Sequence, residues 1–241
     1  MSSINKILIH HIRSLALRLI LLACAIFFYF TDAEILDFTE VFQKGIGGAF
    51  LWIVWVAIAF GMMYRIFPNT RVAIGARKHF KSSFRAAYVK ANLDVKAVAK
   101  QLNKSAILCF CSWFAVTALI LLALFFLDAL TPPIVLIIML TYAVADMAFI
   151  VFLCPFQKLF MKNSCCTTCR IYNWDYFMMC VPMLVMPGFY SVSLALISAI
   201  ILLRWEIAFR KSPHFFMSET NENLRCGACV GRLCKARVFR K

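Results

Sequence analysis

The chain of 241 residues is 63% hydrophobic and only 15% charged, and its mean hydropathy is +0.82. A soluble domain has about 25% charged residues and roughly half apolar ones, so this composition excludes an ordinary soluble fold. The excess apolar surface must leave water, and a lipid bilayer removes it. The formal net charge of +15 comes from cations that flank apolar runs, which argues against nucleic acid as a partner.

Four apolar runs are long enough to cross a membrane as helices, which takes roughly 20 residues. The first run ends in the aromatic segment Phe27–Phe30 and lacks a small-residue cleavage site. It therefore favours a retained membrane anchor over a cleaved signal peptide. The four predicted spans are Leu15–Phe30, Gly48–Phe67, Ala106–Leu127 and Ile134–Cys154.

The distribution of lysine and arginine predicts the orientation of these spans. Residues 31–47 carry four acidic residues and one cation, whereas residues 65–104 carry ten cations and one acidic residue. Because basic loops stay in the cytosol, we expect both termini to be cytosolic in an inner or plasma membrane. The basic segment 68–105 is expected to form an amphipathic helix that lies on anionic lipid.

A fifth apolar stretch, Tyr176–Leu203, is too long for one untilted span and short for two. Both of its flanks are basic, which places both in the cytosol. The sequence Met186-Pro187-Gly188 supplies a break, because proline removes a helix donor and glycine tolerates a turn. We therefore predict a membrane hairpin, made of two short spans or a re-entrant loop. The alternative is one long tilted helix with the tail outside.

Together these features predict an all-α polytopic membrane protein of about six helices, with a small cysteine-rich cytosolic cap. The expected segments are residues 1–30 (N-terminus and first span), 31–47 (acidic extracytosolic loop), 48–67 (second span), 68–105 (basic amphipathic segment), 106–154 (third and fourth spans), 155–175 (cytosolic loop), 176–203 (hairpin) and 204–241 (cytosolic tail).

Eleven cysteines include two CxxC pairs, one on each side of the hairpin. Tetrahedral zinc takes four thiolates, commonly from two such pairs, so the hairpin would bring one complete site together. Iron, alone or as an iron–sulfur cluster, uses the same ligands. A thiol–disulfide relay, or cysteines that are acylated or free, would also account for the pairs. The predicted ligands are Cys166, Cys169, Cys226 and Cys229, with Cys165 and Cys234 in reserve.

The remaining cysteines near the cytosolic ends of spans are interpreted as small hydrophobic side chains. They are Cys109, Cys111, Cys154 and Cys180.

Asp146 is the acidic residue near the middle of a predicted span, and an ionisable group at that depth is a candidate functional residue. Tyr142 lies one helical turn earlier on the same face, so the two could line a polar track or substrate site. We expect no lysine or arginine at matching depth, so the carboxyl would be neutral. The alternative is a carboxyl that joins helices through the hydroxyl of Thr117 or Ser193.

Asp175 and Glu206 flank the predicted metal site and could accept hydrogen bonds from its surroundings or donate protons. The pattern favours transport, lipid handling or membrane assembly, with a zinc-stapled cap that could also bind a partner protein. The alternative is a membrane oxidoreductase whose iron centre acts on a quinone-like or lipid substrate. No nucleotide, hydrolase or haem motif is present in the sequence, and whether the protein is an enzyme stays open.

Overall fold

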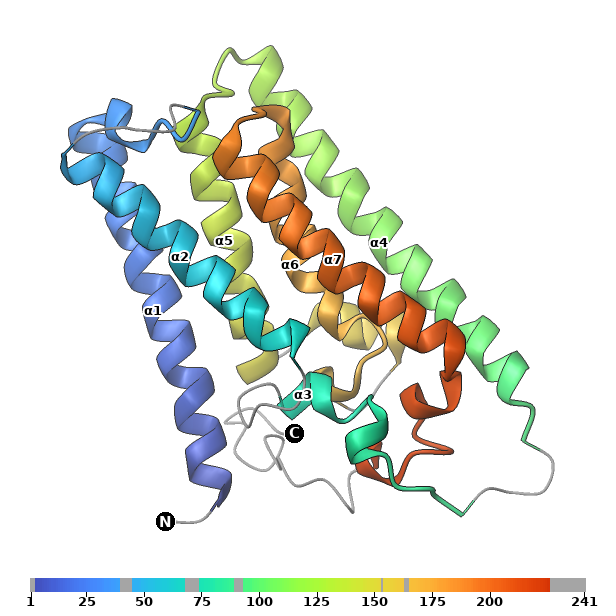
Figure 1. Cartoon of the computed structure of the whole chain (residues 1–241). Helices are drawn as coiled ribbons and strands as arrows, with labels where there is room; N and C mark the ends of the chain where they lie inside the picture. Colours follow the sequence, from blue (N-terminus) through green and yellow to red (C-terminus); the bar gives the residue numbers. More distant parts are fainter. Residues whose placement is uncertain are drawn as a thin grey trace.

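The structure, a computed structural model, describes residues 3–39, 45–67, 74–88, 93–152, 154–162 and 165–225. These residues form helices and loops without a strand, and their one isolated β-bridge joins Ala86 to Asn221. The long helices, shown in Figure 1, are α1 (Ser3–Thr31), α2 (Ile46–Ile66), α4 (Val95–Phe126), α5 (Pro132–Val151) and α7 (Phe189–Lys211).

These long helices are the five described helices that are long and apolar enough to cross a membrane. Their most apolar windows have mean hydropathies of 2.0 to 2.5, which is typical of spans that lipid surrounds. Large apolar side chains such as Phe27, Phe60 and Leu119 are exposed on their outer faces, where hydrocarbon takes the place of water. The prediction of an all-helical protein is confirmed for the described residues, and their five long apolar helices are compatible with a multi-pass membrane protein.

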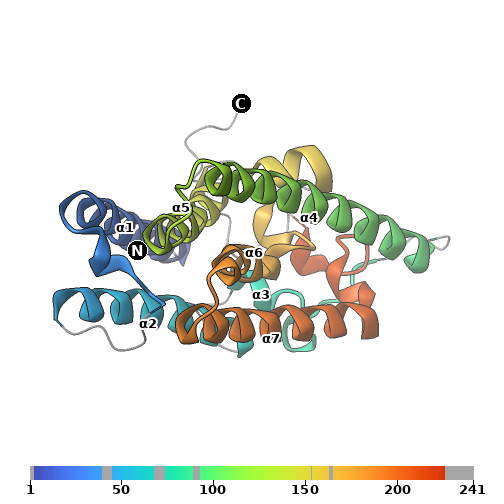
Figure 2. The same ribbon diagram turned by 90° about the horizontal axis from the view of Figure 1, so that it is seen from above.

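The helices are arranged in two rows with one short helix between them. In Figure 2, α1, α5 and α4 lie along one side and α2 and α7 along the other, with α6 (Asp175–Cys180) in the middle. The core between the rows is apolar. Its fully buried side chains include Val54, Met62, Leu136, Met139, Leu140, Met183 and Leu194.

The stretch 176–203 folds back on itself. Helix α6 continues into a 3-10 turn (Val181–Val185), and α7 begins after Gly188. At one end of the two legs, the indole N–H of Trp174 donates to a carboxylate oxygen of Glu206 at 2.8 Å. At the other end, the Ser191 hydroxyl donates to the carbonyl oxygen of Met186 at 2.9 Å. The two legs are thus antiparallel, with the break at the predicted Met186–Gly188 sequence and a first leg much shorter than the second.

Helix α4 begins earlier than the predicted third span. It starts at Val95, where the Asp94 carboxylate accepts the backbone N–H groups of Lys96 at 2.9 Å and Ala97 at 3.2 Å. This N-cap satisfies donors that have no partner within the helix. At about 1.5 Å per residue, α4 is longer than a hydrocarbon core of about 30 Å, so its first turns extend beyond the apolar part.

The prediction of one basic amphipathic helix over residues 68–105 is wrong for residues 74–88, whereas residues 95–105 are helical as the first turns of α4. Residues 74–88 contain only the four-residue helix α3 (Ile74–Arg77) and a 3-10 turn. Their backbone is hydrogen-bonded instead to the chain after α7. The N–H of Ala87 donates to Thr220 at 2.9 Å, and the N–H of Glu222 donates to Arg85 at 2.8 Å. Long-range backbone partners satisfy these groups in place of the hydrogen bonds that a helix would make within itself.

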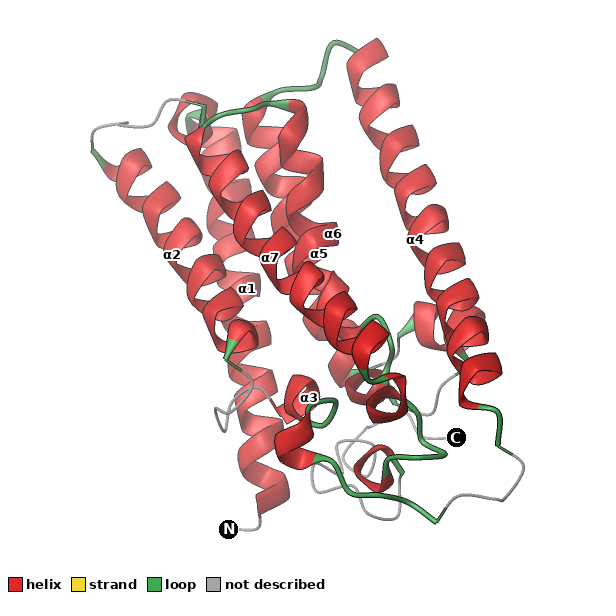
Figure 3. Ribbon diagram, turned by 45° about the vertical axis from the view of Figure 1, so that its right-hand side comes forward, coloured by secondary structure: helices red, strands yellow, loops and turns green. Residues whose placement is uncertain are grey.

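We call residues 74–88, 165–174 and 213–225 the basal layer. It packs against the end of α7 around Trp205, which is fully buried and whose indole N–H donates to the carbonyl oxygen of Arg170 at 2.7 Å. Figure 3 shows this layer below the helices, with α4 set to one side of the others. The contact with Trp205 holds residues 165–174, the loop that carries the first CxxC pair, against the end of α7.

Acid is expected to destabilise the basal layer through His79. Its ring packs against Trp205 and Phe216, and its Nδ1 lies 3.1 Å from the carbonyl oxygen of Gly75. Burial lowers the pKa of His79 from 6.5 to about 4. Between these values the unfolded chain binds a proton that the folded chain does not, so stability falls as pH drops, by about 3 kcal/mol in total.

The variant His79→Gln, which stays neutral, should lose this part of the acid sensitivity. The measurement is the unfolding temperature in detergent from pH 7 to pH 4. Equal pH slopes for the variant and the original protein would contradict this account.

Candidate functional site

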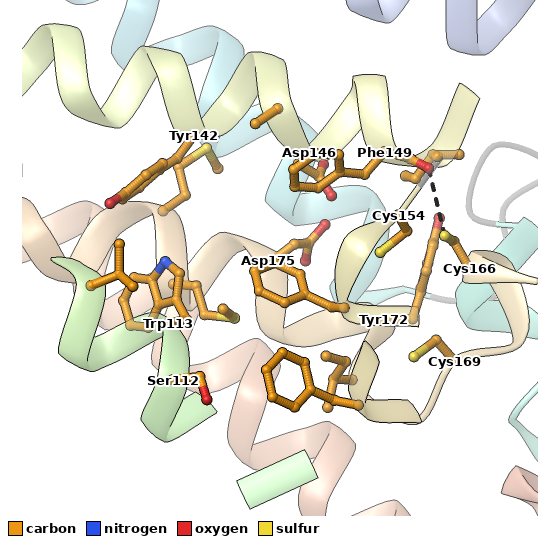
Figure 4. A pocket seen from close by; sticks show the side chains of 18 of the residues that line it. Ser112, Trp113, Tyr142, Asp146, Phe149, Cys154, Cys166, Cys169, Tyr172 and Asp175 are labelled. Atoms are coloured by element: carbon orange, nitrogen blue, oxygen red, sulfur yellow. Dashed lines mark hydrogen bonds between the residues drawn. The ribbon is translucent and has the colours of Figure 1, made fainter. Parts of the chain in front are cut away.

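A cavity of about 430 Å³ lies between α4, α5, α6 and the loop that carries the first CxxC pair. Figure 4 shows it at close range. Most of its wall is apolar or aromatic. The lining residues that the site depends on are Trp113, Val116 and Ile120 of α4, Tyr142, Asp146 and Phe149 of α5, Met178 and Met179 of α6, and Cys154, Phe156, Phe160, Cys166, Cys169, Tyr172 and Asp175 around its base.

The cavity exists because α4 stands away from α5 and α6. A hydrogen bond of 2.9 Å between the hydroxyls of Thr117 and Tyr142 joins α4 to α5 on one side of it. Val116 and Ile120 line the cavity, and their side chains are 57% and 40% exposed, so the cavity is open beside α4.

Asp146 lies in the cavity wall and is paired with Arg18 of α1. The Arg18 guanidinium donates to the Asp146 carboxylate at 2.9 Å and to the carbonyl oxygen of Ala143 at 2.6 Å. The expectation that no cation lies at matching depth is wrong. Arg18 belongs to the apolar run of the first span, and helix packing brings it to α5. Thr117 bonds Tyr142, and Ser193 accepts from the indole of Trp55 at 2.9 Å, so neither joins Asp146.

Asp175 forms a second buried pair, with Arg65 at the end of α2. The two Asp175 oxygens accept from Arg65 at 2.6 and 3.2 Å, and the side chain of Asn173 accepts at 2.8 Å. The ring of Tyr176 lies 5.0 Å from the Arg65 guanidinium, and its hydroxyl accepts from Arg18 at 3.4 Å. The ion pairs Arg18–Asp146 and Arg65–Asp175 are thus linked through Tyr176. We call these five side chains the polar chain behind the cavity.

Glu206 lies outside the cavity, in contact with the basal layer. Its two oxygens accept from the guanidinium of Arg170 at 2.8 and 2.6 Å. That guanidinium also lies 3.8 Å from the ring centroid of Phe209. Asp175 and Glu206 were predicted to flank the metal site, where they could accept hydrogen bonds or donate protons. Each carboxylate accepts hydrogen bonds from its own buried arginine.

Cysteine thiols form one end of the cavity. Cys154, Cys166 and Cys169 all line it, as Figure 4 shows. The Cys166 thiol donates to the side-chain oxygen of Gln157 at 3.0 Å and lies 3.6 Å from the carbonyl oxygen of Phe149. The thiol of Cys154 lies at the same end of the cavity and interacts with Cys166.

The thiols differ in their surroundings. Hydrogen bonds from Cys166 and from the backbone N–H groups of Gln157 and Phe156 outweigh burial and lower the pKa of Cys154 to about 7. Burial raises the pKa of Cys169 to about 12. A lowered thiol pKa is typical of reactive cysteines, whereas apolar burial makes a thiol inert. Cys154 was interpreted from the sequence as a small hydrophobic side chain, and no local sequence signal indicates its contact with Cys166.

The predicted four-cysteine metal site lies partly outside the described residues. Cys226, Cys229 and Cys234 follow residue 225, where the described chain stops. Cys165 is buried, with its sulfur 3.2 Å from the hydroxyl of Thr167. Among the described residues, no group of three or more histidine, cysteine or acidic side chains is arranged to hold a metal ion.

Removing Asp146 should destabilise the protein more than removing an exposed carboxylate. The change Asp146→Ala leaves the Arg18 guanidinium buried without its carboxylate partner, which should cost about 3 kcal/mol of unfolding free energy. Adding Arg18→Met should recover much of that loss, because no charge is then left unpaired. The exposed Asp32, whose side chain makes no cap hydrogen bond, provides the control Asp32→Ala.

The measurement is the free energy of unfolding in mixed detergent micelles. Additive losses in the double variant would contradict a direct pairing between the two side chains.

Comparison with known proteins gives no match to any protein family, curated protein or solved structure. Arguments about function therefore start from the cavity, from the polar chain behind it and from the thiols at its end.

Proposed function

We propose that this membrane protein handles a lipid-soluble molecule, which it binds in the cavity between α4, α5 and α6. The observation that carries this proposal is an aromatic cavity with an edge exposed beside α4. Its volume of about 430 Å³ is in the range of small-molecule sites, which are about 300–1,000 Å³. Lipid handling is one of the three functions that the sequence pattern favours, and the cavity supports it over transport or membrane assembly.

The polar groups of the wall indicate what the ligand carries. Tyr142 offers a hydroxyl, and the carboxylates of Asp146 and Asp175 accept hydrogen bonds while paired with arginines. A ligand with an apolar body and hydroxyl or carbonyl groups at one end fits these partners.

The proposed orientation puts the basal layer in the cytosol, in an inner or plasma membrane. Its support is the excess of cations in residues 65–104 over residues 31–47, because basic loops stay in the cytosol. At the start of α4, Lys96, Lys100 and Lys104 are exposed and recur every four residues, so they share one face. We propose that this face contacts anionic lipid, where each cation contributes about 1 kcal/mol. A protein partner at the cap stays a prediction.

Filling the cavity should displace its ligand. Ala145 of α5 lines the cavity, whereas Ala115 of α4 is exposed and is not among the lining residues. The variant Ala145→Phe should therefore lose co-purifying apolar molecules, and the matched control Ala115→Phe should keep them. Native mass spectrometry of protein released from detergent measures both. Equal ligand content in the two variants would overturn the proposal.

Zinc also remains a proposal, with Cys166, Cys169, Cys226 and Cys229 as its ligands and iron as the alternative metal. The described half does not by itself fit a metal site, because the Cys166 thiol is already hydrogen-bonded to Gln157 and no third ligand lies with Cys166 and Cys169 among the described residues. Cys234, a reserve ligand, would complete a set with Cys169, Cys226 and Cys229 if Cys166 does not take part.

Metal analysis separates these possibilities. Zinc bound by the CxxC pairs should be present at one equivalent and without colour, and Cys226→Ser with Cys229→Ser should remove it, while Cys24→Ser in α1 should not. Iron with visible charge-transfer absorption would favour the membrane oxidoreductase instead. If protein purified without chelators contains no metal, both the zinc proposal and the iron alternative are contradicted.

A second candidate function, the membrane oxidoreductase, is favoured by one specific observation. Three thiols lie at the end of an aromatic cavity, beside the place proposed for the ligand. Thiols that contact each other can exchange electrons with a bound molecule without any metal.

A further inference from the structure

Two cysteines from different segments meet at the end of the cavity. Cys154 follows α5, and Cys166 opens the 3-10 turn of the first CxxC sequence. Both residues line the cavity, and Cys166 is the side chain that acts most strongly on the Cys154 thiol. Figure 4 shows both sulfurs at the same end of the cavity, with Tyr172 beside them. Such proximity is what a disulfide between two chain segments requires before it can form.

We propose that Cys154 and Cys166 form a dithiol–disulfide couple that exchanges two electrons with a quinone-type ligand in the cavity. The inference rests on the proposed function, which places a lipid-soluble ligand there, and it names the chemical class of that ligand. The two thiols lie in the cavity wall, so a bound ring can reach them directly.

The wall of the cavity suits a flat ring with oxygen substituents. Trp113, Phe149 and Phe156 provide aromatic faces and edges, against which a ring packs favourably. The carboxylates of Asp146 and Asp175, which also line the cavity, can accept from the hydroxyls of a quinol. A long apolar tail leaves along the exposed edge of α4 into lipid.

The reaction balances without any further reagent. In the forward direction the S–H bonds of Cys154 and Cys166 break and one S–S bond forms between their sulfurs. Two electrons and two protons pass to the quinone, whose two carbonyl oxygens become the hydroxyls of the quinol. In the reverse direction a quinol reduces the disulfide. The balanced route has two steps: one thiolate adds to the quinone ring, and the partner's thiolate then attacks that sulfur, so that the S–S bond forms while the S–C bond breaks and its electron pair leaves with the quinol. The second step needs contact between the two residues.

The neighbouring cysteines are placed less well for this chemistry. Cys169 packs with Cys109 in a separate apolar cluster with Met161 and Ile171. Cys165 is not among the residues that line the cavity, and its sulfur contacts the hydroxyl of Thr167. The pair of Cys154 and Cys166 thus combines contact between thiols with access to the cavity.

The test uses the full chain in detergent, purified without oxygen, reduced and freed of reductant. Decylubiquinone is added, its absorbance is followed, and disulfides are mapped by mass spectrometry of peptides. We expect about one quinone reduced per chain and a disulfide between Cys154 and Cys166 in the original protein. Cys154→Ser and Cys166→Ser should each abolish quinone reduction. Cys111→Ser, at an exposed cysteine of α4 outside the cavity, should not change it.

Quenching of tryptophan fluorescence by decylubiquinone in Cys154→Ser separates the two proposals. Quenching that saturates, together with no 154–166 disulfide in the original protein, overturns the dithiol couple and leaves the ligand cavity standing. A covalent quinone adduct that persists in the original protein without forming the 154–166 disulfide, or a disulfide that involves other cysteines, also overturns the couple. Absence of saturable quenching in both proteins, together with equal ligand content in the Phe variants of Ala145 and Ala115, overturns both proposals.

Discussion

Charge buried among apolar helices is the constraint on which the rest of this structure depends. An unpaired guanidinium or carboxylate in a low-dielectric interior costs several kcal/mol, so each must find its partner when the helices pack. Arg18 of α1 pairs with Asp146 of α5, and Arg65 of α2 pairs with Asp175 of α6. Tyr176 contacts both arginines. Four helices are thereby joined in one arrangement.

The cavity lies between α4 and the helices that these ion pairs join. Helix α4 takes no part in either ion pair and joins its neighbours through the hydroxyl pair of Thr117 and Tyr142 and through the contact of Asn103 with Arg170. The space between α4 and the paired helices is lined by side chains from both. Its carboxylates are held in place by arginines behind them, so the wall presents oriented acceptors to a ligand in an otherwise apolar site.

Contacts within the basal layer fix the position of the loop that carries the first CxxC pair, which forms one wall of the cavity. Arg170 is almost fully buried, and it is held by Glu206 and by the face of Phe209. Trp205 binds the backbone of the same arginine. These contacts join the loop to α7, and the thiols of Cys154 and Cys166 then meet although they belong to separate segments of the chain.

The sequence by itself determined the membrane class, the approximate spans and the break at Met186–Gly188, because apolar run length and proline act locally. It also marked Asp146 and the first CxxC pair as candidates, since charge and thiols are rare at such positions. Only the tertiary structure decided that Arg18 pairs with Asp146 and that Cys154 meets Cys166. Both contacts join segments that local periodicity does not connect, because it does not show which faces of two helices or loops pack together.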